Sequence, residues 1–156
     1  MSTIVAIDSM TLVWGVRKQG TDEQIQRAKW LFEMLEEEKS QIVVPTVAVA
    51  EYLTPIPSND HAAVLAAMRE RFLLAPFDVR AASLAAQLFG EGRIVRTVGK
   101  PGARKCLRAD SLIIATAVTF GARVFYTGDD DCRTMASKVM EAKGMPTQGP
   151  NLFSGV

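Results

Sequence analysis

The sequence predicts an α/β fold, a three-layer α/β/α sandwich built around a central and mostly parallel sheet. Short apolar runs rich in β-branched residues, such as the one at 3–7, alternate with longer segments in which apolar residues recur at helical spacing. The short runs are continuously apolar, which is typical of strands that helices cover on both faces. Strands that alternate with helices favour parallel pairing. In such sheets the functional residues lie beyond the carboxyl ends of the strands.

Two strands and two helices are expected in the first third of the chain. They are a strand at 3–7, a helix at 21–39, a strand at 41–45 and a short helix at 47–53. Thr21 or Asp22 supplies the cap of the longer helix. Pro45 stops the second strand, because proline has no N–H to donate to the sheet, and Thr46 is placed to cap the helix that follows.

The rest of the chain continues this alternation. We expect a helix at 59–72, a strand at 73–77, helices at 78–92 and 106–121, a strand at 123–127 and a final helix at 131–143. Gly90 or Gly92 ends the helix at 78–92, and Gly121 ends the helix at 106–121. The tail from Gly144 onward is rich in Gly and Pro and leaves room for a short edge strand.

Length and composition indicate an ordinary globular protein. We expect a single domain over residues 1–156, because that length suffices for a full hydrophobic core. The net charge of +1 gives no overall attraction to a polyanion. Cys106 and Cys132 form no CxxC pair, which favours a reducing compartment. No apolar run approaches the roughly 20 residues that span a bilayer, and the start lacks a secretory pattern, so we expect a cytoplasmic protein with no membrane partner.

Two aspartates follow predicted strands. Asp8 comes directly after the strand at 3–7, and Asp129 follows the strand at 123–127 after one glycine. Parallel strands end at the same edge of a sheet, so both carboxylates are expected at that edge. Each residue also has a purely structural explanation, since Asp often caps the next helix.

Glu51 lies on the side of its predicted helix that Val47 and Ala48 would bury. A capping box from Thr46 would need Glu or Gln at position 49, and Val49 stands there. The usual local explanation for this acid therefore fails, and a salt bridge is the structural alternative.

Asp110 lies on the apolar face of the predicted helix at 106–121. The residues three, four and seven positions further on are Ile113, Ile114 and Ala117. A buried carboxylate is costly unless it is paired or binds a metal. The alternative is a helix that starts at Ser111, with Asp110 as its cap.

The acids expected at this edge of the sheet are Asp8, Glu51, Asp110 and Asp129. Carboxylates so close together repel one another unless a cation lies among them. Mg²⁺ or Mn²⁺ fits best, because both prefer oxygen ligands and the chain has one histidine and no His or Cys cluster for zinc. We expect Asp8, Asp110 and Asp129 to bind the metal, with Asp131 as a further ligand, while Asp130 faces solvent or caps the last helix.

A carboxylate–metal cluster suits phosphoryl transfer by a metal-activated water. The sequence contains no G-x-S-x-G elbow and no P-loop, which argues against a serine hydrolase and an NTPase. The segment at 92–108 carries six cations and no acid and leads directly into the helix of Asp110: Arg93, Arg96, Lys100, Arg104, Lys105 and Arg108. Such a segment fits the backbone of a nucleic acid. The alternative is a solvated basic loop that balances nearby acids.

The chain resembles the PIN-domain family in three stretches that occur in the family's order. They are IVAIDSMTLVWGV, VVPTVAVAEYL and RADSLIIATAVTFGARVFYTGDDD, and they contain the four acids. The resemblance implies a PIN-like fold and a Mg²⁺- or Mn²⁺-dependent nuclease that cuts single-stranded RNA, with the four acids as catalytic residues. Small members of the family are similar to VapC-like toxins, which implies a homodimer and an antitoxin partner.

The chain departs from the family pattern beside the first and fourth acids. Ser9 fits the small polar pair expected after Asp8, but Met10 does not, and Cys132 stands where Phe often follows. These changes concern secondary polar contacts more than the four acids. The contacts expected with the substrate come from Ser9, Thr127, Arg104, Lys105 and Arg108.

Three other functions compete with the nuclease. A haloacid-dehalogenase-like phosphatase needs a second Asp at position 10, where Met10 stands. A receiver-like domain needs a pair of acids after the first strand, where only Asp8 is present. A catalytically inactive PIN-like scaffold that binds RNA or a partner protein is the main alternative, and the presence of all four acids argues against it.

Overall fold

The computed structural model describes the backbone of residues 2–95 and 103–150 and the side chains of residues 2–90 and 108–150. Its centre is a five-stranded sheet in which every neighbouring pair of strands is parallel. The strands are β1 (Ile4–Ile7), β2 (Gln41–Pro45), β3 (Leu73–Ala75), β4 (Val124–Tyr126) and β5 (Glu141–Lys143). Their order across the sheet is β3-β2-β1-β4-β5. The predicted parallel α/β architecture is confirmed.

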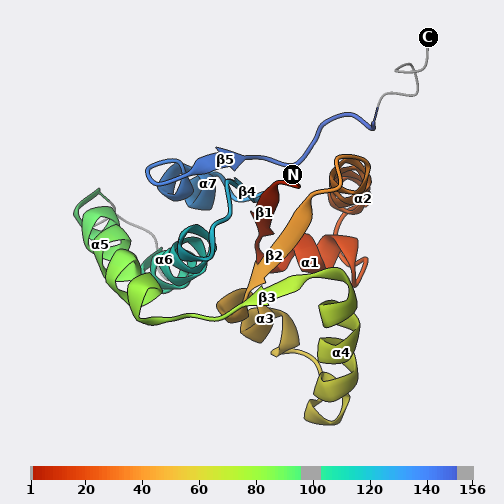
Figure 1. Ribbon diagram of the computed structural model, residues 1–156, viewed down its shortest axis with the longest axis horizontal. Helices are drawn as coiled ribbons and strands as arrows, with labels where there is room; N and C mark the ends of the chain where they lie inside the picture. The colour runs from red at the N-terminus through yellow and green to blue at the C-terminus, as the bar shows by residue number, and fades with distance from the viewer. Residues whose placement is uncertain (1, 96–102, 151–156) are drawn as a thin grey trace.

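Helices complete the sandwich on both sides of the sheet. They are α1 (Ser9–Gly15), α2 (Asp22–Glu37), α3 (Thr46–Leu53), α4 (His61–Arg71), α5 (Val79–Val95), α6 (Ala103–Phe120) and α7 (Asp130–Ala136), with a 3-10 turn at Ser58–Asp60. Helices α1 and α2 lie on one side of the central strands, and α5 and α6 lie on the other (Figure 1). Helix α4 extends away from the body of the molecule (Figure 1).

The two central strands are covered on both faces, as their continuous apolar sequence predicts. Val5, Ala6 and Ile7 of β1 are all buried, although successive side chains of a strand point to opposite faces. Phe125 of β4 is completely buried beside them. Because β1 pairs in parallel with both β2 and β4, the residues that directly follow these three strands lie at the same edge of the sheet.

Helix α2 forms where its sequence predicts. Gln24 N donates to Thr21 Oγ1 at 3.1 Å, and Thr21 N donates to Gln24 Oε1 at 2.9 Å, which is a reciprocal capping box. Ala28, Leu31 and Leu35 recur at helical spacing and are completely buried. Thr21, rather than Asp22, is therefore the cap of this helix.

Several expected elements differ in the structure. The predicted final helix at 131–143 is wrong beyond α7, because the chain turns and adds β5 as an edge strand. Two of the three residues of β5, Glu141 and Lys143, are charged, as exposed edge strands often are, and the strand lacks the apolar run of a central strand. Helix α1 was not expected, since seven residues are too few to show a helical period. Helix α5 continues through Gly90 and Gly92. Thr46 begins α3 and forms no side-chain cap.

Candidate active site

The carboxyl ends of β1, β2 and β4 lie side by side at one edge of the sheet. Ile7, the last residue of β1, is paired with Tyr126, the last residue of β4. Asp8 therefore emerges beside Thr127, and Asp129 follows two residues later. Helix α3, which carries Glu51, starts where β2 ends. The sheet thus brings three of the four predicted acids to one edge.

Asp8 is buried and holds the start of α1. Its Oδ1 accepts hydrogen bonds from the backbone N of Thr11 at 3.0 Å and from Thr11 Oγ1 at 2.8 Å. Its Oδ2 accepts a bond from Thr127 Oγ1 at 2.6 Å. Burial raises the pKa of the Asp8 carboxyl above its usual range, the bonds from Thr127 and Thr11 lower it, and the charge of Asp129 raises it further. Removal from water outweighs the three bonds, so the Asp8 carboxyl keeps its proton to a higher pH than an exposed aspartate does.

Asp129 is exposed and caps α7. Its Oδ1 accepts hydrogen bonds from the backbone N of Asp131 at 2.8 Å and of Cys132 at 3.0 Å. The capping role that was the structural alternative for Asp8 and Asp129 is therefore present at both residues. Capping engages only one oxygen of each carboxylate with its own helix, so it does not exclude a second role.

Thr127 connects these two aspartates. Its hydroxyl donates to Asp8 Oδ2 and accepts from the backbone N of Asp129 at 3.1 Å. Its side chain is completely buried. Thr127 was expected to contact the substrate, but its hydroxyl bonds inside the protein, between the two acids.

Ser9 joins α1 to α3 at the same edge. Its hydroxyl donates to Glu51 Oε1 at 3.2 Å. Glu51 is exposed, so it does not lie on the buried face of α3 that its spacing from Val47 and Ala48 predicted. Partial desolvation of its carboxyl still raises its pKa, the bond from Ser9 lowers it, and the charge of Asp8 raises it. Glu51 is therefore close enough to Asp8 for their charges to interact.

Asp110 lies on helix α6. It lies well inside α6, so a helix that starts at Ser111 is ruled out. Its side chain is partly buried. Burial raises the pKa of the Cys132 thiol, and the carboxylates of Asp110, Asp8 and Asp129 add to that rise. These three acids thus lie within electrostatic range of one buried thiol.

The remaining acids of the Asp129–Asp131 run point differently. Asp130 forms an ion pair with Arg133, with Oδ1 and Nη2 2.6 Å apart, and faces solvent as expected. Asp131 is exposed in the first turn of α7. Within residues 2–90 and 108–150, no three His, Cys, Asp or Glu side chains form a ready-made metal site. The oxygen donors are of the right type for Mg²⁺. In this structure Asp8 and Asp129 cap helices, and Asp8 and Glu51 accept bonds from hydroxyl groups.

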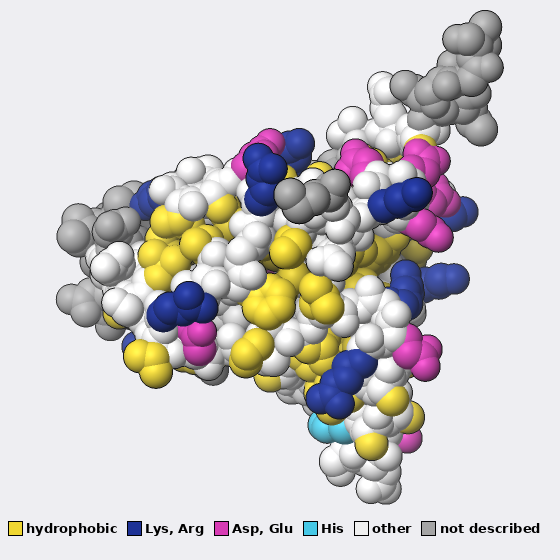
Figure 2. Space-filling model, in the orientation of Figure 1, with side chains coloured by type: hydrophobic (Ala, Val, Ile, Leu, Met, Phe, Trp, Pro, Cys, Tyr) yellow, Lys and Arg dark blue, Asp and Glu magenta, His cyan; other side chains and the backbone are white. Residues whose placement is uncertain are grey.

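The predicted substrate cations lie mostly outside the described side chains. Arg104 and Lys105 belong to the first turn of α6, but their side chains are not among those described. Arg108 is described and exposed, and its guanidinium lies 5.0 Å from the centre of the Phe89 ring of α5. On the face shown in Figure 2, the described cations are scattered among acids and do not form a single basic patch.

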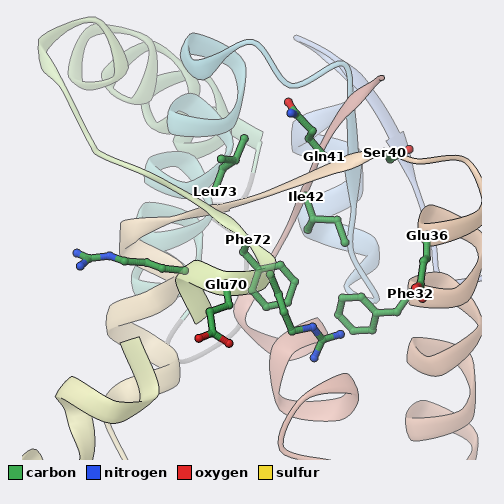
Figure 3. Close-up of a pocket in the computed structure, with 10 residues that line it drawn as sticks. Phe32, Glu36, Ser40, Gln41, Ile42, Glu70, Phe72 and Leu73 are labelled. Atoms are coloured by element: carbon green, nitrogen blue, oxygen red, sulfur yellow. The ribbon is translucent and has the colours of Figure 1, made fainter. Parts of the chain in front are cut away.

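A pocket of about 420 Å³ lies elsewhere, at the amino ends of β2 and β3 (Figure 3). Arg71 packs there over the rings of Phe32 and Phe72, at 5.5 and 5.3 Å from their centres. Because parallel strands begin at the edge opposite the one where they end, this pocket is separate from the acids. It is therefore not the active-site candidate.

Two residues beside the acids were not identified from the sequence. Thr11 donates both its N–H and its hydroxyl to Asp8, and its place three residues after a capping Asp is the only pattern that could have indicated this. Arg17 contacts Tyr52, the neighbour of Glu51, across 35 residues of sequence. No local pattern reports such a contact.

Comparisons with known proteins identify the type of fold. No protein-family model and no curated protein sequence matches the chain. A chain in the crystal structure of VapBC2 from Rickettsia felis, bound to a DNA fragment from their promoter, is 13% identical with a TM-score of 0.62, over 92% of this chain and 100% of that one. The fold is PIN-like, of the VapC type.

Two further structures agree. DNA-bound VapBC from Salmonella typhimurium contains a chain that is 15% identical with a TM-score of 0.61, over 92% of this chain and 98% of that one. VapC20 from Mycobacterium tuberculosis, described as a Sarcin-Ricin loop cleaving toxin, is 16% identical with a TM-score of 0.53, over 83% and 93%. At these identities the likeness establishes the PIN-like fold and not the activity. In the described part of the chain, no helix has the length and apolar character to cross a membrane.

Proposed function

We propose that the chain is a cytoplasmic Mg²⁺- or Mn²⁺-dependent endoribonuclease that cuts single-stranded RNA with a metal-activated water, and that residues 1–156 form one nuclease domain. The observation that supports this proposal is the placement of Asp8, Glu51 and Asp129 at the carboxyl edge of a PIN-like sheet, with Asp110 of α6 in electrostatic range of the same buried Cys132 as Asp8 and Asp129. Neighbouring carboxylates repel one another, since the charge of Asp129 raises the pKa of Asp8 and the charge of Asp8 raises the pKa of Glu51. A cation reverses such repulsion.

The metal ligands that we assign are Asp8, Asp110 and Asp129, with Asp131 as a further ligand. When bound there, Mg²⁺ or Mn²⁺ would lower the pKa of a water molecule and neutralise charge on the scissile phosphate. The residues of the chain prepare that chemistry. Thr11 and Thr127 orient the Asp8 carboxylate, and we assign to Thr127 this orienting role in place of substrate contact.

Glu51 is the fourth catalytic residue of the proposal. Ser9 holds its Oε1, and we assign Oε2 to accept a proton from the attacking water. Partial desolvation and the neighbouring Asp8 raise its pKa, which makes a carboxylate a better proton acceptor near neutral pH. Ser9 also lies close enough to this rim to contact the substrate.

RNA is the substrate we assign, through Arg104, Lys105 and Arg108 at the start of α6. Arg108 is exposed, and its guanidinium packs over the ring of Phe89. We further propose that the protein forms a homodimer and is restrained by an antitoxin. The support for an antitoxin is that similar structures are VapBC complexes, which pair a VapC-type chain with a second protein.

One observation favours the alternative of an inactive PIN-like scaffold. Asp8 and Asp129 both cap helices, and within the described residues no three acids are arranged as a metal site. In that case the same acids would serve only the fold, and the chain would bind RNA or a partner without cutting it.

Cleavage of a mixed pool of single-stranded RNA distinguishes the two functions. The wild-type protein is incubated with Mg²⁺, with Mn²⁺ and with EDTA, beside Asp110→Asn. Asp130→Asn is the matched control, because Asp130 is an acid of the same cluster region that pairs with Arg133 and faces away. We expect metal-dependent cutting that Asp110→Asn abolishes and Asp130→Asn retains.

Calorimetric titration with Mn²⁺ accompanies the cleavage assay. Absence of both cutting and Mn²⁺ binding would establish the scaffold. Mn²⁺ binding without cleavage of the pool would support the metal site. It would also mean that the protein cuts a narrower RNA target than the pool supplies.

A further inference from the structure

Arg17 supports the end of α3 that carries Glu51. Its Nη2 donates a hydrogen bond to the backbone carbonyl of Tyr52 at 2.6 Å. The guanidinium carbon also lies 4.3 Å from the centre of the Tyr52 ring. Tyr52 is buried and directly follows Glu51 in the chain. A single side chain therefore contacts both the backbone and the ring of the neighbour of a predicted catalytic residue.

Helix α3 needs such support more than a longer helix would. It has eight residues, and its N-cap is Pro45, which makes no side-chain cap bond. The last carbonyls of a helix have no partner inside it, and a cation near them is favoured by the helix dipole. The N–H of Thr54 satisfies the carbonyls of Ala50 and Glu51, and Arg17 satisfies that of Tyr52. Arg17 thus completes the C-terminal end of α3.

Helix α1 connects Arg17 to the acids. Asp8 and Thr11 fix the first turn of α1, and Ser9 in that turn reaches Glu51. Arg17 lies just beyond the other end of α1, where its own N–H bonds to the carbonyl of Leu12. Residues at the two ends of one short helix therefore contact Glu51 and the residue next to it. Moving the last turn of α3 would require breaking both contacts.

We propose that Arg17 is a positioning residue that fixes Glu51 by holding the last turn of α3 against α1. Its effect on catalysis rests on the proposed nuclease function, whereas its effect on the position of α3 does not. The competing explanation is that Arg17 only stabilises the fold. The two differ because a positioning role acts on Glu51 in particular, and a stabilising role acts on the whole molecule.

The variant that tests this is Arg17→Met, which keeps most of the aliphatic stem and removes the charge and the donors. Arg80→Met is the matched control. The Nη2 of Arg80 also donates to a backbone carbonyl near a helix end, that of Thr119 in α6, at 3.4 Å, but outside the cluster of acids. Arg17→Lys restores one cationic donor and should recover part of any loss.

Amide hydrogen exchange measures the position of α3 without any activity. Hydrogen bonds to charged groups are worth enough to change local opening by about tenfold. We expect the amides of Thr54 and Ile56 to exchange about tenfold faster in Arg17→Met, and at the wild-type rate in Arg80→Met. An unchanged rate at these amides in Arg17→Met, or equal acceleration throughout the protein, would overturn the proposal.

Cleavage kinetics test the link to Glu51 through a double-mutant cycle with Glu51→Gln. We expect Arg17→Met to lower kcat about tenfold in the wild-type background and to have no further effect when Glu51→Gln is present. Equal losses in both backgrounds would show a general structural effect and reject the positioning role. If the wild-type protein does not cut RNA, the proposed function fails, and the exchange rates alone decide whether Arg17 holds the end of α3.

Discussion

Asp8 is a single residue of the proposed site whose burial lowers the stability of the folded protein near neutral pH. Three hydrogen bonds reach its carboxylate, yet burial still raises its pKa. A raised pKa in the folded state means that the folded protein binds a proton more tightly than the unfolded chain does. The stability that this supplies is present at low pH and is lost as the pH rises from about 3.9, the value of an unfolded aspartate, through the higher folded value.

Replacing this residue should therefore stabilise the metal-free protein. We expect Asp8→Asn to have a higher Tm than the wild type at pH 7 in EDTA, and a flatter dependence of Tm on pH between 4 and 7. Thermal melts across that range provide the measurement, with Asp130→Asn as a control that follows the wild type. A lower Tm for Asp8→Asn at pH 7 would mean that the hydrogen bonds to the ionised carboxylate outweigh its burial.

At the scale of elements, the turn between β4 and α7 is fixed by close packing against α1. A Cβ atom at Gly128 would lie 2.5 and 2.6 Å from ring atoms of Trp14, which is buried. Only glycine lets α1 approach this turn, and Gly128 separates Thr127 from Asp129. The packing of Trp14 thus sets where the fourth acid lies. By contrast, a Cβ at Gly90, inside α5, would have no atom within 4 Å.

The two glycines therefore predict opposite effects of the same substitution. We expect Gly128→Ala to lower the free energy of unfolding by about 1–3 kcal/mol through overpacking. Gly90→Ala should raise it by roughly 0.5–1 kcal/mol, because alanine favours a helix over glycine. Urea denaturation of both variants measures this. Similar effects of the two substitutions would contradict the contact between Gly128 and Trp14.

The elements also show where prediction from sequence succeeds and fails. The central strands and the buried helices were predicted because their apolar residues have a clear period. Asp8 and Asp129 could be placed at one edge of the sheet because the strand ends could be located, whereas Glu51 and Asp110 were singled out by their positions on predicted helices. Helix α1 and strand β5 were missed because each is short, and β5 is exposed at an edge. The roles of Thr127 and Arg17 depend on partners 119 and 35 residues away, which no local pattern specifies.

For the whole molecule, binding of a divalent cation should couple to folding, if the proposed function holds. At a Mn²⁺ concentration a hundredfold above Kd, binding stabilises the folded state by about 2.7 kcal/mol. For a chain of this size we expect a rise in Tm of roughly 5–10 °C. Asp110→Asn should lose this rise, and Asp130→Asn should keep it. Differential scanning fluorimetry with Mn²⁺ and with EDTA measures this change in Tm. A rise in Tm that persists in Asp110→Asn would mean that the ion binds at another site.

The hydrogen bond from Thr127 to Asp8 spans 119 residues of sequence and has a consequence for how the protein is made. Asp8 is synthesised well before its partner hydroxyl on Thr127 and before Asp129, which follows in the same turn. No incomplete product of translation that ends before Asp129 contains the whole set. A chain released before that point therefore has Asp8 without its Thr127 partner or without Asp129, and cannot assemble the proposed site.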